Sequence, residues 1–73
     1  MNSTQAITER QREILMFIVS FAKRQGFPPT VREIAEFIGS KNPTAAISAL
    51  RALEKKGFIK RTPTVSRGIK IIH

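Results

Sequence analysis

The stretch Asn42–Lys56, NPTAAISALRALEKK, determines how the rest of the chain must be arranged. Asn42 is a favourable helix cap, Pro43 suits the first helical position, and Gly57 suits the left-handed residue that ends a helix. Between these signals, apolar residues recur at i, i+4 and i+7, at Ala46, Leu50 and Leu53. This spacing predicts a helix that buries one side in a core.

The opposite side of this predicted helix is short, polar and thin. At about 100° per residue it carries Thr44, Ala45, Ser48, Ala52 and Lys55, with Arg51 on its flank. Such a surface suits the major groove of DNA, which admits one α-helix and is read by short polar and apolar side chains. The alternative is an ordinary surface helix whose outer side meets only water. The helix by itself does not separate these two interpretations.

The length of 73 residues predicts one small domain with a thin core. Disulfides are excluded because the chain has no cysteine, which fits a reducing compartment. No apolar run approaches the length of a membrane span, and the N-terminal residues lack the pattern of a signal peptide. We therefore expect a cytoplasmic protein with no membrane partner.

The formal net charge is +8, and most of it falls in the second half of the sequence. Residues 1–39 hold five basic and four acidic residues, whereas residues 40–73 hold eight basic residues against Glu54 alone, a net charge of +7. A one-sided basic field is typical of proteins that neutralise phosphates. A solubility face and attraction to acidic lipid are the alternatives. We rank them lower because no basic amphipathic helix with bulky apolar anchors accompanies the charge.

The N-terminal half contains two further helix patterns. Residues 1–7 are expected to form a flexible end, and Thr8 with Gln11 forms a capping-box pattern that opens a helix ending at Gly26. Its apolar side is broad and predicts the central helix of the core, with Met16 at the margin. The residues of that side are Ile14, Leu15, Phe17, Ile18, Val19, Phe21 and Ala22.

Phe27-Pro28-Pro29 predicts a stiff, extended connection to the next helix, since each proline restricts the residue before it. A second capping box, Thr30 with Glu33, opens a short helix through Ile38, with inward-facing Ile34, Ala35 and Ile38. Residues 39–41 then form a tight, glycine-led turn into Asn42. A short helix, a turn of about three residues and a second helix make a helix-turn-helix.

After Gly57 the pattern changes to that of a hairpin. Residues 58–62 and 69–72 predict two strands joined by a turn at 63–68. We expect this hairpin to lean on the helices through Phe58, Ile69 and Ile71, because two strands alone are marginally stable. Its outer positions are expected to be basic, at Lys60, Arg61, Arg67 and Lys70. These charges suit a phosphate backbone, although they also discourage pairing between sheet edges.

Together these patterns predict a mainly α fold with a small β-hairpin, a three-helix winged helix-turn-helix occupying residues 8–73. The chain has no Asp and no Cys, and its single His is residue 73, so no metal site is expected. No nucleophile can be placed in a pocket in so small a domain, and Ser66 is better interpreted as a turn residue or phosphate donor. We expect no enzymatic activity, no cofactor and no small-molecule ligand.

Three segments resemble the N-terminal DNA-binding domain of the LexA family, bacterial repressors of the SOS response to DNA damage. They are TERQREILMFIVSFAKRQGFPPTVREIAEFIG (8–39), NPTAAISALRALEKKGFI (42–59) and SRGIKII (66–72). The resemblance runs from about Ile7 to Ile72, and its specific motifs are PPT-x-x-EIA and SRGI. It implies a winged helix-turn-helix that represses transcription by binding a double-stranded DNA operator, as an SOS-like or a phage or plasmid regulator.

The resemblance also implies which residues contact DNA. In that family the first half of the recognition helix contacts bases, which here gives Asn42, Thr44, Ala45, Ile47 and Ser48. The flanking Arg51 is added from the helix geometry. Ile47 departs from the polar residue common in the family, so it either packs half-buried, which we favour, or touches a thymine methyl group. Phosphate contacts are expected from the basic and turn residues Lys41, Lys55, Lys60, Arg61, Ser66 and Arg67.

LexA proteins carry a second domain that dimerises them and cleaves itself with a serine-lysine dyad. This sequence ends where the linker to that domain would begin, so it is expected to be either a fragment of such a repressor or a free-standing relative. We expect a monomer that pairs weakly on a palindromic operator. Two alternative functions are a protein-interaction module acting on a host repressor or polymerase through Met16, Phe37 and Ile47, and nonspecific coating of nucleic acid.

Overall fold

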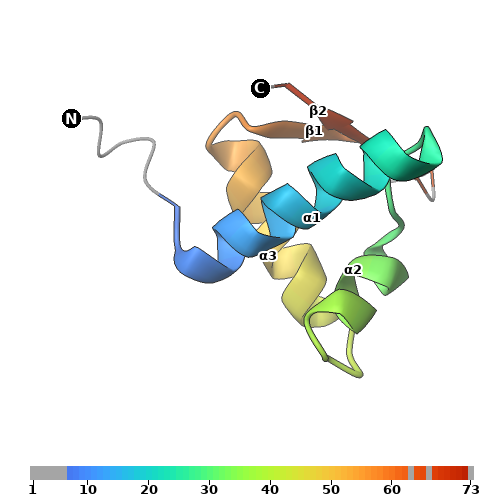
Figure 1. Ribbon diagram of the computed structural model, residues 1–73. Coiled ribbons are helices and arrows are strands. Elements are labelled where there is room, and N and C mark those ends of the chain that lie inside the picture. The colour runs from blue at the N-terminus through green and yellow to red at the C-terminus, as the bar shows by residue number, and fades with distance from the viewer. Residues whose placement is uncertain (1–6, 63, 66, 73) are drawn as a thin grey trace.

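The computed structural model describes residues 7–62, 64–65 and 67–72. Three helices are followed by a two-stranded antiparallel hairpin (Figure 1). This order confirms the mainly α architecture with a small hairpin. The elements are α1 (Glu9–Gln25), α2 (Val31–Phe37), α3 (Thr44–Lys55), β1 (Ile59–Arg61) and β2 (Ile69–Ile71).

Both predicted capping boxes are present. The Thr8 hydroxyl accepts from the Gln11 N–H at 3.0 Å, and the Gln11 side chain accepts from the Thr8 N–H at 3.1 Å. Thr30 and Glu33 repeat the arrangement at 3.1 and 2.8 Å, which opens α2. These reciprocal bonds satisfy backbone donors that the first turn of a helix leaves without partners. The boxes therefore fix where α1 and α2 begin.

The recognition helix begins later than predicted. We expected it to span Asn42–Lys56 with Asn42 as the cap, whereas α3 spans Thr44–Lys55 and Pro43 occupies the residue before it. Pro43 has helical dihedral angles, φ −68° and ψ −8°, so the turn tightens into the helix over two residues. The Asn42 side chain still accepts the Thr44 N–H at 2.9 Å, and it therefore satisfies an N-terminal donor as a cap does.

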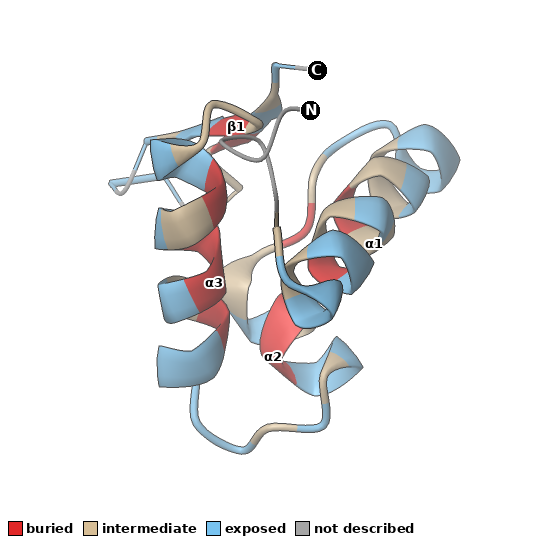
Figure 2. Ribbon diagram, turned by 90° about the vertical axis from the view of Figure 1, so that its left-hand side faces the viewer, coloured by how far each residue is buried: buried red, intermediate tan, exposed pale blue. Residues whose placement is uncertain are grey.

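The core is formed where α1, α2, α3 and the hairpin meet. Its buried residues are Ile14, Ile18, Ile34, Ala35, Ala46, Ala49, Leu50, Leu53, Ile59 and Ile69. In Figure 2 the buried side of α3 faces α1 and α2, and its exposed side lies opposite. The predicted stripe of α3 is confirmed, and Ala49 joins it. Ile7 is partly buried against this core, and residues 1–6 of the expected flexible end lie outside the described part of the chain.

The hairpin contacts the core through the three residues that we expected, Phe58, Ile69 and Ile71, and through a fourth, Ile59. Ile59, 1% exposed, is its most buried side chain, while Phe58 and Ile71 are half-buried. The register pairs Ile59 with Ile71 and Arg61 with Ile69, so these four share the inner face. Phe58 packs against the core as predicted, and its N–H also donates to the Leu53 carbonyl at 3.0 Å, which closes the connection from α3.

The α3 contribution to the core can be measured with a matched pair of variants. Leu50→Ala removes a fully buried side chain, and we expect a loss of about 2–4 kcal/mol in the free energy of unfolding. Met16→Ala truncates a side chain that is 62% exposed, and a change within about 0.5 kcal/mol is expected. Urea titrations followed by circular dichroism measure both values. Equal losses would contradict this assignment of the core.

Candidate nucleic-acid interface

The exposed side of α3 is a stripe centred on Thr44, Ser48, Arg51 and Lys55. All four are exposed. Their spacing of i, i+4, i+7 and i+11 places them on one side of the helix, each about one turn after the last. Arg51 belongs to the stripe and lies on its edge toward Ile47. Ala45 and Ala52 form one flank, where their small side chains keep the surface shallow.

Asn42 and Thr44 form a local network at the start of this stripe. The Asn42 Oδ1 accepts from the Thr44 N–H at 2.9 Å and from the Thr44 hydroxyl at 2.7 Å. Since the oxygen is engaged twice, Asn42 presents its amino group, for which no acceptor is found among the described residues. The Thr44 hydroxyl, having given its proton to Asn42, presents an acceptor. The Asn42 amino group is thus a donor and the Thr44 hydroxyl an acceptor, and Thr44 lies one helical turn before Ser48.

Ile47 lies on the other flank of the stripe and is half-buried. It is not among the partly buried residues that pack against the core, which include Phe17 and Phe58. Its exposed part lies beside the polar stripe, and its role stays a prediction.

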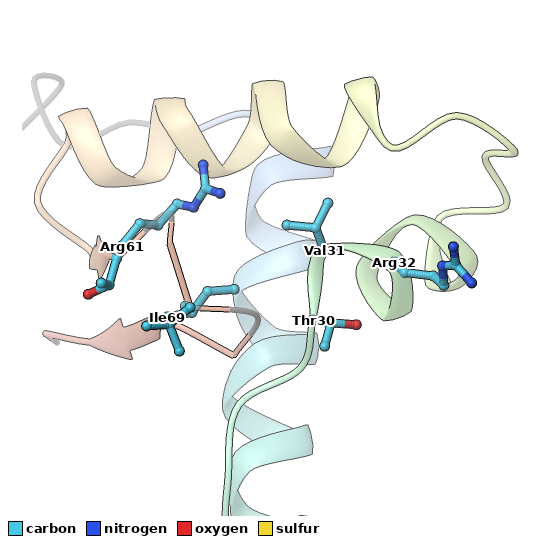
Figure 3. Close-up of a pocket in the computed structure, with 8 residues that line it drawn as sticks. Thr30, Val31, Arg32, Arg61 and Ile69 are labelled. Atoms are coloured by element: carbon cyan, nitrogen blue, oxygen red, sulfur yellow. The ribbon is translucent and has the colours of Figure 1, made fainter.

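The basic residues of the hairpin do not share one surface. Lys60 and Lys70 pair across the strands on the outer face and are exposed. Arg61, predicted to be an outer residue, lies on the inner face with Ile69 because of the strand register, and it is half-buried. Figure 3 shows its side chain extending from β1 toward α3.

Arg61 borders an open cleft between the hairpin and the start of α2. The cleft has a volume of about 350 Å³ and is lined by Thr30, Val31, Arg32 and Ile69 among others (Figure 3). Arg32 is a basic residue that the sequence reasoning did not select. The signal was its place two residues after the Thr30 cap, at the start of the helix that precedes the turn. Its side chain is exposed and extends over α2, away from Arg61 (Figure 3).

Arg67 does not lie on the free basic surface that we expected. Its guanidinium donates to both carboxylate oxygens of Glu33, at 2.8 and 3.2 Å, and to the Pro28 carbonyl at 2.9 Å. It also stacks over Phe27, with 4.6 Å between its central carbon and the ring centroid. Ser66, the neighbouring predicted contact, lies outside the described residues. Lys41 and Lys55 are exposed, as a phosphate contact requires.

Glu33 has an altered pKa because of these contacts. The hydrogen bond from Arg67 is the largest cause that lowers the pKa of its carboxyl group, and the bond from the Thr30 N–H adds to it. Both favour the ionised form, and they outweigh the opposing effect of desolvation. The same carboxylate therefore caps α2 and holds the hairpin of β1 and β2, which we call the wing.

Other kinds of site are not found in the described part of the chain. Within residues 7–62, 64–65 and 67–72, no three metal-binding side chains of the His, Cys, Asp or Glu type gather in one place. Over the same residues, none of the helices combines the length and apolarity that a membrane crossing needs.

Comparison with known proteins shows the family to which the chain belongs. The family model for the LexA DNA binding domain matches residues 4–68. The LexA repressor of Pseudomonas aeruginosa is 52% identical over 92% of this chain and 33% of its own length. LexA repressor 1 of Pseudomonas putida is 52% identical over 89% of this chain and 32% of its own. The LexA repressor of Methylococcus capsulatus is 48% identical over 90% of this chain and 33% of its own length. The chain thus spans about a third of these relatives.

The lowered pKa of Glu33 predicts a pH-dependent contribution to stability. Because the pKa is lower in the folded chain, the contribution is complete above the unfolded value of about 4.5 and is lost as pH falls through the folded value. Glu33→Gln keeps a side chain able to complete the capping box but removes the charge. We expect the variant to be less stable by about 1 kcal/mol at neutral pH, a value reduced for the partial exposure of the pair.

The measurement is the free energy of unfolding of both proteins at about pH 7 and about pH 3. The difference between them should be smaller at the lower pH, because the stabilising charge is lost as pH falls through the lowered pKa of the native carboxyl group. A difference that is the same at both values would show that the charge of Glu33 is not the stabilising feature.

Proposed function

Because the chain belongs to the LexA DNA-binding domain family, we propose that it binds a specific sequence in double-stranded DNA and represses transcription there. The observation that carries this proposal is the exposed side of α3. A thin polar stripe lies directly opposite the buried side, bordered by Lys41 and Lys55 at its two ends. A helix with such short side chains on its exposed side fits the major groove, where base edges present distinct donors and acceptors.

In the proposed complex the first half of α3 reads bases. Asn42 donates from its amino group to purine acceptors, and Thr44 offers an acceptor to a base amino group. Ser48 and Arg51 extend the contact along the stripe, since Arg is well suited to the two acceptors of guanine. Ala45 and the exposed part of Ile47 lie on the two flanks, where a methyl group of thymine can be accommodated.

The wing holds the phosphate backbone in this proposal. Lys60 carries an exposed ammonium group, and Arg61 borders the cleft beside α3 together with Arg32. Lys41 and Lys55 would reach the backbone at the two ends of the recognition helix. These contacts position the domain without reading sequence. Ser66 remains a predicted phosphate contact.

One domain of this size reads a half-site, so full operator recognition needs two copies. We propose that two chains pair weakly on a palindromic operator whose half-sites are spaced by whole helical turns. The pairing surface is not assigned to particular residues.

A second candidate is binding to another protein. Its support is an exposed aromatic surface on α1 and α2, where Phe37 is 47% exposed and stacks on Phe17 with 4.3 Å between ring centroids. Salt dependence separates the two candidates. DNA binding weakens steeply as salt rises because counterions are released, whereas an apolar protein interface does not.

The test of the main proposal is selection of bound duplexes from a random library at low and near-physiological salt. We expect one enriched motif that survives the higher salt, and a palindrome with fixed spacing if two copies pair. Binding without enrichment that disappears as salt rises would leave only phosphate attraction and would overturn sequence-specific recognition.

Two variants separate base contacts from phosphate contacts on the selected duplex. Ser48→Ala should cost about 1–3 kcal/mol on this duplex and little on random DNA, because one base contact is lost. Ser48 is a cleaner choice than Thr44, whose hydroxyl also bonds Asn42. Lys60→Ala should weaken both duplexes alike and reduce the salt slope by about 1. Equal losses of specificity in the two variants would refute the division of roles.

A further inference from the structure

Arg67 joins three separate parts of the chain at one guanidinium. Its Nη1 donates to the Pro28 carbonyl at 2.9 Å and to Glu33 Oε1 at 2.8 Å, while its Nη2 donates to Glu33 Oε2 at 3.2 Å. The aromatic ring of Phe27 covers it, and Phe21 of α1 lies 5.9 Å away. The partners are 34 and 39 residues distant in sequence. Such a fork, bidentate on a carboxylate and stacked on an aromatic ring, is a use for which lysine cannot substitute.

The contact acts on a wing that has little stability of its own. The hairpin has three residues in each strand, and a two-stranded hairpin of any length is marginal in water. Its buried residues, Ile59 and Ile69, lie within the strands, so the turn between them needs another support. Arg67 precedes β2 by two residues and supplies that support.

The turn can transmit the restraint to the basic strand. The Thr62 N–H donates to the Gly68 carbonyl at 2.7 Å, and the Gly68 N–H donates to the Val65 carbonyl at 3.0 Å. The approach is so close that a Cβ atom on Gly68 would collide with the Thr62 carbonyl. A chain fixed at Arg67 is therefore also fixed at Thr62, which directly follows Lys60 and Arg61.

We propose that Arg67 is a positioning residue for DNA binding: by holding Glu33, the Pro28 carbonyl and Phe27, it sets the wing so that Lys60 reaches phosphate. This inference rests on the proposed function. It differs from direct phosphate contact, in which the Arg67 guanidinium itself would meet DNA. It also differs from a general contribution to folding, which would leave the wing of every folded molecule in place.

The test compares four variants of the full chain for affinity to the selected duplex and to a random-sequence duplex. Arg67→Ala, Arg67→Lys and Glu33→Gln should each lower affinity about three- to tenfold on both duplexes, since each breaks the fork. Arg10→Ala is the matched control. It removes one arginine and one exposed pair, Arg10 with Glu13 on α1, away from the proposed interface, and affinity should hardly change.

Direct phosphate contact makes the opposite forecast for two of these variants. Arg67→Lys would then keep most of the affinity, because lysine retains the charge, and Glu33→Gln would leave binding unchanged or tighter, because it releases the guanidinium. Either result would overturn the positioning role. Circular dichroism at the assay temperature checks that each variant is folded.

A double-mutant cycle with Lys60 separates positioning from a general loss of stability. If Arg67 positions the wing, the factor by which Lys60→Ala lowers DNA affinity should become clearly smaller when Arg67 is already alanine. If Arg67 only stabilises the fold, the loss caused by Lys60→Ala should be the same in both backgrounds. An unchanged loss would overturn the proposal.

Amide hydrogen exchange without DNA keeps this inference distinct from the function on which it rests. The amides of Thr62 and Gly68 should exchange faster in Arg67→Ala than in Arg10→Ala, while the Leu50 amide changes less. Equal exchange in the two variants would overturn the restraint whatever the affinity data give. If the native chain binds no duplex at all, the proposed function fails, and faster exchange at the wing would still establish the restraint on its own.

Discussion

The burial of one side of α3 is the constraint on which the rest of the structure depends. Ala46, Ala49, Leu50 and Leu53 are all buried, and no polar side chain is buried among the described residues. A core this small and apolar specifies its packing through shape, because alanines at two of these four positions let α1 and α2 approach α3 closely. Once that side is fixed, the opposite side of the helix is fixed as well. The same residues that hold the fold together therefore decide which side chains can reach a partner.

The hairpin depends on a second, electrostatic constraint that shares a residue with the helical core region. Glu33 accepts the Thr30 N–H and the Arg67 guanidinium with the same carboxylate oxygen, so the start of α2 and the base of the wing are held by one charge. Partly exposed ion pairs usually contribute little to stability. Here the bidentate geometry and the stack on Phe27 fix the orientation of the Arg67 guanidinium relative to Glu33 of α2.

Signals between neighbouring residues allowed much of the fold to be predicted, whereas contacts between residues distant in sequence could not be predicted. The capping boxes at Thr8 and Thr30 and the apolar stripe of α3 depend on residues a few positions apart, so their patterns are visible in sequence. Ile59 was not predicted alongside Phe58, because a three-residue strand is too short for alternation to show which face is buried. Most of the exposed stripe was foreseen from helix geometry. The pairing of Arg67 with Glu33 was not predicted, since the two residues are 34 positions apart and no periodicity connects them.

The pairing of Arg67 changes how the basic charge of the sequence should be interpreted. Residues 40–73 carry a net charge of +7, yet the guanidinium of Arg67 is paired with the carboxylate of Glu33, which lies outside that range. Fewer cations are thus available to phosphate than the count implies, and salt dependence should follow the available number. In the proposed complex the remaining cations hold the phosphate backbone, and discrimination between sequences comes from the polar stripe of α3. The proposed pairing of two copies on a palindromic operator would multiply that discrimination.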